Sequence, residues 1–151
     1  MPLRCEIVTQ DRLLFDGPAD MVVAPGTEGL MGILPHHAPL LSTLAFGTLT
    51  VRYQGEEEVF AIAGGVIEVL PDLVTVLADS GEHVAEIDEE RAEEARRRAE
   101  ELLAMGPPPD TDQYLAIQAA LRRSNLRLTT ARKYRRKGPS RGRPGEGSGP
   151  G

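Results

Sequence analysis

This chain of 151 residues contains few of the residue types that cross-link a fold or carry out catalysis. Tryptophan is absent and aromatic residues make up 4% of the sequence, so a core must be built from Val, Ile, Leu and Ala. The one cysteine, Cys5, cannot form a disulfide within the chain, which favours a reducing compartment. Because Cys5 lies in an alternating apolar pattern, we expect a buried structural thiol rather than a nucleophile.

Long apolar runs and clusters of metal ligands are also missing. No stretch approaches the ~18 apolar residues that a membrane-spanning helix needs, and the start, M-P-L-R-C-E, lacks the features of a signal peptide. We therefore expect a soluble protein that reaches a membrane only through its partners. His36, His37 and His83 are the three histidines, too few to predict a metal site. No nucleophile is paired with a base, which argues against an enzyme.

Charge is divided unevenly along the chain. Residues 1–86 carry 3 Lys or Arg and 13 Asp or Glu, a net charge of -10. Residues 87–151 carry 14 and 10, a net charge of +4. An acidic first part followed by a basic second part indicates two surfaces that face different partners, or that face each other.

Short stretches of alternating apolar and polar residues fill the first half of the chain, and turn residues separate them. Strands of this length and spacing predict an antiparallel β-sandwich or barrel, with no long helix before residue 78. Gln54-Gly55 predicts a hairpin turn between two of the strands. The predicted strands are 3–9, 12–15, 20–24, 47–53, 57–63, 66–70 and 73–78, with breaks at Asp16-Gly17-Pro18, Pro25-Gly26, Gly64-Gly65 and Pro71-Asp72.

Residues 25–39, P-G-T-E-G-L-M-G-I-L-P-H-H-A-P, are unusually rich in glycine and proline. A phosphate-binding loop is one interpretation, but the spacing matches neither G-x-x-x-x-G-K-[ST] nor G-x-G-x-x-G, and no helix follows. We therefore expect a structural loop that exposes Ile33, Leu34, His36 and His37.

The stretch D-S-G-E-H-V-A-E-I-D-E-E-R-A, residues 79–92, marks the change from strand to helix. Asp88 suits a helix N-cap, because its carboxylate can accept a hydrogen bond from an unpaired backbone N–H of the first turn. Glu89 and Glu90 place negative charge at the positive end of the helix dipole. The simplest interpretation is a well-capped helix start, and a hinge with a ligand site is the alternative.

Two helices are expected after this point. Small apolar residues recur at helical spacing in the first of them, and the run Gly106 to Pro109 ends it. Asp110 or Thr111 then caps a second helix that runs to about Lys133. Within the first helix we expect the ion pairs Glu93–Arg97 and Glu94–Arg98. The stripe of the first helix is Ala92, Ala95, Ala99, Leu102 and Leu103, and the inner face of the second is Tyr114, Ile117, Leu121, Ser124 and Leu128.

Each helix alone buries little apolar surface, so an antiparallel hairpin that docks on the acidic body or detaches from it is the natural product. After it, glycine and proline become too frequent for an ordered backbone. We thus expect an α+β protein with three parts: a β-sandwich at 1–86, a two-helix hairpin at 87–134 and a disordered basic tail at 135–151. The tail lacks the stacking aromatics of a nucleic-acid-binding segment, so RNA binding is a minor alternative.

Five strings in this order resemble the epsilon subunit of bacterial F-type ATP synthases, over residues 3 to about 133. They are E-G-L-M-G-I-L-P-H-H-A-P-L-L-S at 28–42, A-G-G-V-I-E-V-L at 63–70, V-T-V-L-A-D at 74–79, I-D-E-E-R-A at 87–92 and A-L-R-R-S-N-L-R-L at 120–128. Ser124 departs from the family, in which alanine is commoner at this position.

The resemblance implies a non-catalytic central-stalk subunit of a proton-driven ATP synthase, on the cytoplasmic face of the bacterial cell membrane. It implies that the sandwich binds the gamma subunit and the ring of c subunits. It also implies that the hairpin extends toward the alpha and beta subunits to inhibit ATP hydrolysis. Candidate rotor contacts are Met31, Gly32, Ile33, Leu34, His36 and His37.

The resemblance further implies that no cofactor is required, with ATP as a candidate regulatory ligand of the folded hairpin. Arginines on two facing helices would suit phosphate groups. The candidate nucleotide-binding residues are Glu82, Ile87, Asp88, Arg91, Ala92, Arg98, Arg123 and Arg127. A free-standing ATP-sensing protein with the same two parts is the alternative function.

Overall fold

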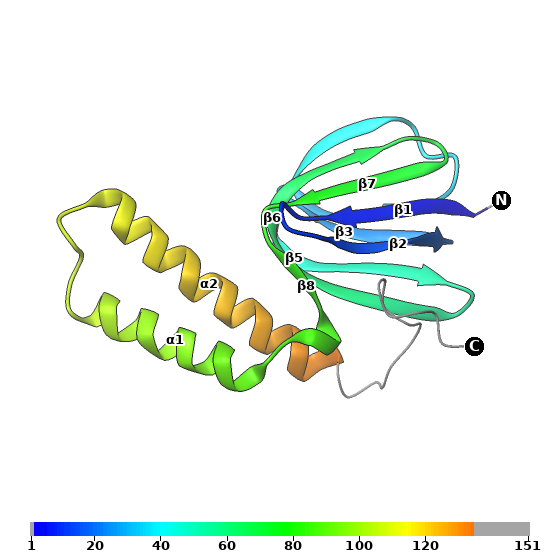
Figure 1. The fold of residues 1–151 in the computed structure, drawn as a ribbon. Helices are drawn as coiled ribbons and strands as arrows, with labels where there is room; N and C mark the ends of the chain where they lie inside the picture. The colour runs from blue at the N-terminus through cyan, green and yellow to red at the C-terminus, as the bar shows by residue number, and fades with distance from the viewer. Residues whose placement is uncertain (1, 135–151) are drawn as a thin grey trace.

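The computed structural model describes residues 2–134, so the expected disordered tail at 135–151 lies outside the described residues. Within them, an N-terminal sheet of eight strands is followed by two helices (Figure 1). The elements are β1 (Leu3–Val8), β2 (Leu13–Ala19), β3 (Met21–Gly26), β4 (Gly29–Ile33), β5 (Leu40–Tyr53), β6 (Glu56–Val69), β7 (Leu73–Ala78), β8 (Gly81–His83), the 3₁₀ helix η1 (Val84–Glu86), α1 (Glu89–Ala104) and α2 (Thr111–Tyr134).

The strands form one sheet in the order β2-β1-β7-β6-β5-β3-β4, with β8 added beside β6. This sheet folds over itself, because β5 and β6 are each 14 residues long and β2 contacts β5 across the core. The expected α+β class and β-sandwich are therefore confirmed. Most pairs are antiparallel, as expected, but β1 and β7 pair in parallel, with Cys5 opposite Val74. That pairing joins distant segments, so no local pattern predicted it.

Side chains alternate along the strands and point either into the sandwich or out of it. The interior holds 19 buried apolar residues, among them Leu3, Ile7 and Phe60, and Cys5 is fully buried as expected. Phe60 meets Phe15 edge to face, with 5.9 Å between ring centroids. Aliphatic residues thus supply most of this core.

Two expected breaks in the first strands were wrong. The predicted turn around Pro18 lies inside β2, and Pro25 lies inside β3. β2 lies at the edge of the sheet, and proline, which has no backbone N–H to donate, is tolerated in edge strands. In β3 the pairing with β5 shifts register between Val23 and Gly26, an irregularity that accommodates Pro25.

The predicted loop 25–39 was also partly wrong, because it contains strand β4 (Gly29–Ile33). Ile33 pairs with Val22 and is fully buried in the core, so the expectation that it would be exposed is corrected. Glycines in this stretch suit an extended backbone as well as a turn. The β5 strand likewise begins at Leu40, seven residues before its predicted start.

The hairpin turn at Gln54-Gly55 is confirmed. Both residues have positive φ, 52° and 81°, and Tyr53 pairs with Glu56 across the turn. These angles are those of a type I′ turn, whose twist matches the flanking strands.

The helix start at Asp88 is confirmed as well. Oδ1 of Asp88 accepts a hydrogen bond from the N–H of Arg91 over 3.1 Å, and Glu89 and Glu90 occupy the first turn of α1. The helix ends at Ala104, just before Gly106, which has a φ of 96°. The domain boundary after residue 86 stays a prediction, because η1 lies between the last strand and α1.

Charge pairs on α1 differ from the expected ones. Arg96 bonds Glu93 and also lies 2.7 Å from Glu100, while Arg132 of α2 lies 3.4 Å from Glu93. The hydrogen bond from Arg96 holds the pKa of the Glu93 carboxyl below its ordinary value. Glu93 of α1 thus forms ion pairs within its own helix and with α2, whereas the two predicted i,i+4 pairs lay within α1 alone.

Candidate functional site

The two helices meet the sandwich mainly through the C-terminal half of α2, and the turn of the hairpin projects away from the sheet (Figure 1). A small apolar cluster forms this junction. It is made of Val59, Ala61, Val84, Ile87 and Ala131, with Leu126 and Tyr134 packed against it. Val59 and Ala61 are the outward-facing residues of β6, so the sheet presents small apolar side chains to the helix.

Polar contacts surround this apolar junction. Arg127 of α2 forms an ion pair with Glu82 of β8. The guanidinium carbon of Arg122 lies 4.2 Å from the centre of the Phe46 ring, a cation–π contact. The hydroxyls of Thr48 and Thr130 lie 3.4 Å apart. The apolar junction and these polar contacts, each of moderate strength, therefore hold α2 on the sandwich.

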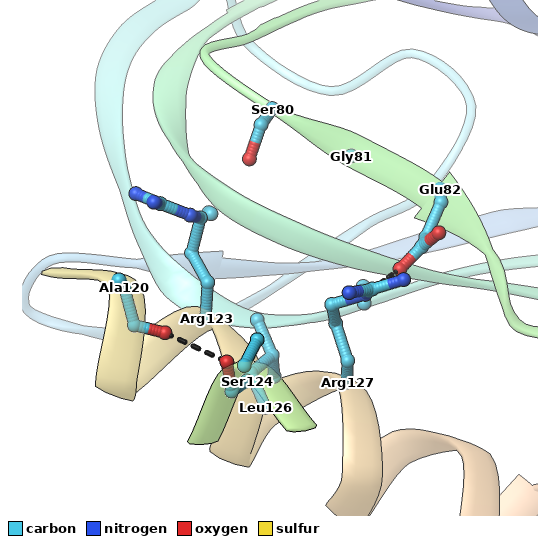
Figure 2. A pocket seen from close by; sticks show the side chains of 11 residues that line it. Ser80, Gly81, Glu82, Ala120, Arg123, Ser124, Leu126 and Arg127 are labelled. Atoms are coloured by element: carbon cyan, nitrogen blue, oxygen red, sulfur yellow. Dashed lines mark hydrogen bonds and ion pairs between the residues drawn. The ribbon is translucent and has the colours of Figure 1, made fainter. Parts of the chain in front are cut away.

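A cleft of about 370 Å³ lies beside these contacts, between the strands and both helices. Figure 2 shows Arg123 and Arg127 extending from α2 toward the segment that carries Ser80, Gly81 and Glu82. The residues that line the cleft are Ala61, Ala63, Ser80, Gly81, Glu82, Ala95, Ala120, Arg123, Ser124, Leu126 and Arg127. Its volume is within the range of about 300–1,000 Å³ that is usual for small-molecule sites.

Three of the eight predicted nucleotide-binding residues line this cleft: Glu82, Arg123 and Arg127. Their guanidinium groups and carboxylate give it a mixed charge, and the Arg127 guanidinium is already engaged by Glu82. An anionic ligand would have Arg123 available and would share Arg127 with that carboxylate.

The other five predicted residues do not line the cleft. Ile87 is buried in the apolar junction and Ala92 is fully buried. Asp88 caps α1, while Arg91 and Arg98 are exposed. The string I-D-E-E-R-A therefore has a structural role here, which connects the sandwich to α1.

Several cleft residues were not predicted as site residues. Ser80, Ala95 and Ala120 are small and leave space between the layers. Ser124 is buried and donates a hydrogen bond to the carbonyl oxygen of Ala120 over 2.9 Å. Ser124 and Ala95 stood on the predicted inner faces of their helices, but their helical spacing predicted packing and not a cavity.

The predicted rotor contacts, within residues 31–37 and called the rotor loop below, differ in their exposure to solvent. Leu34 and His36 are exposed, Met31 and His37 are partly buried, and Ile33 is buried. His36 has a φ of 67°, and its N–H bonds the carbonyl oxygen of Pro71 over 2.8 Å. The loop is thereby fixed against the turn between β6 and β7.

A group of exposed apolar side chains on the outer face of the sheet was not predicted from the sequence. Leu41 of β5, Val66 of β6 and Leu77 of β7 lie on the outer face of adjacent strands, with Val66 directly opposite Leu77. Leu41 is 70% exposed and Leu77 is 54% exposed. Exposed apolar side chains gathered on one face of a sheet are candidates for an interaction surface.

Within residues 2–134, no group of three or more His, Cys, Asp or Glu side chains is arranged to hold a metal ion. Neither helix in this part of the chain is long and apolar enough to cross a membrane.

Two family models together cover most of the chain. The ATP synthase delta/epsilon chain β-sandwich domain matches residues 2–84, and the delta/epsilon chain long α-helix domain matches residues 85–132. This chain belongs to the ATP synthase delta/epsilon family. The resemblance seen in the five sequence strings is thus confirmed.

Individual relatives agree with this membership. The chain is 45% identical over 135 residues to the ATP synthase epsilon chain of Herpetosiphon aurantiacus, covering 89% of this chain and 98% of that protein. It is 42% identical over 138 residues to the one from Acidithiobacillus ferridurans, covering 91% and 96%. The chain is therefore an epsilon-type chain of an ATP synthase.

Solved structures give the same fold. A chain in the Euglena gracilis mitochondrial ATP synthase, OSCP/F1/c-ring, aligns with a TM-score of 0.70 and 25% identity, covering 88% of this chain and 82% of that one. A chain in the central stalk and c-ring of the Tetrahymena thermophila mitochondrial ATP synthase aligns with a TM-score of 0.60 and 13% identity, covering 87% and 97%. The second likeness shows the fold alone.

Proposed function

We propose that this chain is a non-catalytic central-stalk subunit, in which the sandwich binds the gamma subunit and the c-ring and the helical hairpin regulates ATP hydrolysis. The observation that carries this proposal is the division of one epsilon-type chain into a sandwich with exposed apolar surface and a lightly docked, arginine-bearing hairpin. In a bacterium, the complex would place the chain on the cytoplasmic face of the cell membrane. No catalytic role is assigned to the chain itself.

Assembly through the sandwich can be tested with matched substitutions. Leu77→Asp places a charge in the exposed patch of the sheet, so it should reduce the gamma and c subunits that copurify with the chain. Leu115→Asp is a suitable control, because Leu115 on α2 is 55% exposed, nearly the same as the 54% of Leu77. Equal recovery of gamma and c subunits with both variants would contradict a rotor contact at this face.

The rotor loop can be tested in the same assay. Leu34 is 56% exposed at the end of the sandwich and is the most accessible apolar side chain among the predicted rotor contacts. Leu34→Asp should weaken recovery of the c-ring more than recovery of the gamma subunit if the loop faces the ring. Loss of both to the same degree would indicate that the two partners do not bind at separate places.

The hairpin is proposed to act on the alpha and beta subunits. Arg91, Arg97, Arg98 and Arg123 are exposed on the helices and would meet an acidic partner surface once α2 leaves the sandwich. The polar contacts of Arg122 and Arg127 with the sandwich are compatible with such release, because both arginines are at least partly exposed.

We also propose that the cleft binds a nucleotide such as ATP. Its volume, its two arginines and the serines on facing walls suit a phosphate-bearing ligand. Calorimetry of the full chain with ATP should show binding that Arg123→Ala weakens about tenfold or more. Arg97→Ala is the control, since Arg97 is exposed outside the cleft. Absence of heat at millimolar ATP, or equal binding by the two variants, would reject the nucleotide site.

A further inference from the structure

A carboxylate and an imidazole lie together inside the sandwich, apart from the cleft residues. Glu58 on β6 is fully buried, and His83 on β8 is 7% exposed. Oε2 of Glu58 lies 2.5 Å from Nε2 of His83, and the His83 ring packs edge to face on Phe60 with 5.1 Å between ring centroids. Acidic side chains are almost never fully buried unless paired, so this pair requires an explanation.

The second ring nitrogen defines where the proton of His83 resides. Nδ1 of His83 accepts a hydrogen bond from the N–H of Ala85 over 3.0 Å, so Nδ1 carries no proton. The proton of a neutral imidazole must then be on Nε2, which donates it to the Glu58 carboxylate. Glu58 thereby selects the tautomer of His83 that offers an acceptor to the following turn.

That turn is the link between the sandwich and the hairpin. His83 is the N-cap of η1, and the N–H of Ile87 bonds the carbonyl oxygen of Val84 at its end, over 3.3 Å. Asp88, the next residue, caps α1. His83 and Asp88 thus cap the two helices at either end of this link, and the Glu58 carboxylate in the sandwich core bonds the first of these two caps.

We propose that the Glu58–His83 pair is a proton-sensitive lock on this link. A proton added to Nδ1 of His83 removes the acceptor for the N–H of Ala85 and leaves two N–H groups facing each other. A proton added to Glu58 removes its negative charge and so weakens the hydrogen bond that it accepts from Nε2–H. Protonation of Nδ1 breaks the hydrogen bond that holds the start of η1, and protonation of Glu58 weakens the bond that orients the ring, so acidification loosens the attachment of the hairpin.

Charged groups on the neighbouring elements are engaged in ion pairs of their own. Glu82 of β8 pairs with Arg127 of α2, and Glu86 of η1 pairs with Arg12 over 2.7 Å. On β6, Glu57 lies 3.7 Å from Arg52 of β5. β2, which also contacts β8, brings Leu14 and Phe15 to this region. Each of these carboxylates already has an arginine partner, so His83 is the side chain on this link that belongs to the residue type with an ordinary charge change between about pH 5 and 8.

Two measurements on the full chain test the lock. ¹⁵N NMR of histidine-labelled protein at about pH 7.5 should show His83 with a protonated Nε2 and an unprotonated Nδ1. Amide hydrogen exchange at residues 84–87 should rise about tenfold between about pH 7.5 and about pH 5.5, after correction for the chemical exchange rate at each pH. A proton on Nδ1 at neutral pH, or corrected exchange that does not depend on pH, would overturn the proposal.

Matched variants separate the lock from general loosening of the turn. His83→Gln should abolish the pH-dependent rise in amide exchange at residues 84–87, called the step below. His36→Gln changes an exposed histidine that is distant from His83 in the sequence, and it should retain the step. Arg12→Ala removes the second anchor of η1 and should raise exchange at both pH values without changing the step. A step that persists in His83→Gln would contradict the proposal. If that variant fails to fold, the NMR measurement on the unmodified chain still decides.

Discussion

At the residue scale, the backbone of β6 depends on two adjacent glycines that the sequence pattern read as a break. Gly64 and Gly65 have φ of 86° and 134°, yet the strand continues through them and pairs with β5 and β7. A Cβ at Gly65 would lie 2.2 Å from the carbonyl oxygen of Leu77. The glycines therefore permit the close approach of β7 to the bent strand.

Gly65→Ala should consequently lower the free energy of unfolding by about 3 kcal/mol or more, because it combines a backbone conformation reserved for glycine with a steric clash. Gly55→Ala is the control: its φ is 81°, but nothing lies within 4 Å of the added Cβ, so only the conformational cost of about 1 kcal/mol remains. Urea denaturation of both variants measures the difference. Equal destabilisation would show that the approach of β7 is not what requires Gly65.

Asp88 offers a second prediction at this scale. Asp88→Ala removes the acceptor for the N–H of Arg91 and should destabilise α1 by about 1 kcal/mol, whereas Asp88→Asn retains a capping oxygen and should cost less. The free energy of unfolding, followed by helical circular dichroism, tests this. Identical losses for Ala and Asn would mean that the charge of Asp88, and not its cap, stabilises the helix start.

At the scale of elements, the attachment of α2 depends on one small buried residue. Ala131 is fully buried in the apolar junction with Val59 and Ala61 of β6. Ala131→Asp would bury an unpaired carboxylate at a cost of several kcal/mol, which exceeds what an exposed ion pair or cation–π contact contributes. We expect α2 to leave the sandwich while the strands stay folded.

Limited proteolysis with trypsin tests this release, because Arg122 and Arg123 lie on the docked half of α2 and should be cut faster in Ala131→Asp. Thr129→Asp introduces the same charge at an exposed neighbour and should leave the cleavage rate unchanged. Cleavage that is equally fast in the two variants, or within the strands, would contradict docking through Ala131.

The elements show what local patterns can predict. Alternation predicted β1 and β7, the cap at Asp88 predicted α1, and the proline run predicted the end of that helix. The strand β4 was missed because glycine and proline suggested a loop, while its pairing with β3 is decided by the burial of Ile33. The parallel pairing of β1 with β7 depends on contacts between distant segments, which no window of sequence contains.

At the scale of the whole molecule, the acidic sandwich and the basic hairpin contact each other through oppositely charged side chains. The acidic body supplies Glu82 and the basic hairpin supplies Arg127, so the expected attraction takes the form of a defined ion pair. Three residues of the predicted nucleotide site converge on one cleft, while the other five belong to the link and the helices. Sequence spacing fixed their position on each helix, but the angle at which α2 meets the sheet decided which of them face the cavity.

We propose that the hairpin restrains ATP hydrolysis while the sandwich holds the chain in the complex. The most direct measurement is the ATP hydrolysis rate of the reconstituted ATP synthase with the chain truncated after residue 86, with subunit content determined in the same preparation. We predict a rate at least about fivefold higher than with the full chain, with gamma and c subunits fully retained. An unchanged rate in a fully assembled complex would contradict the regulatory role of the hairpin.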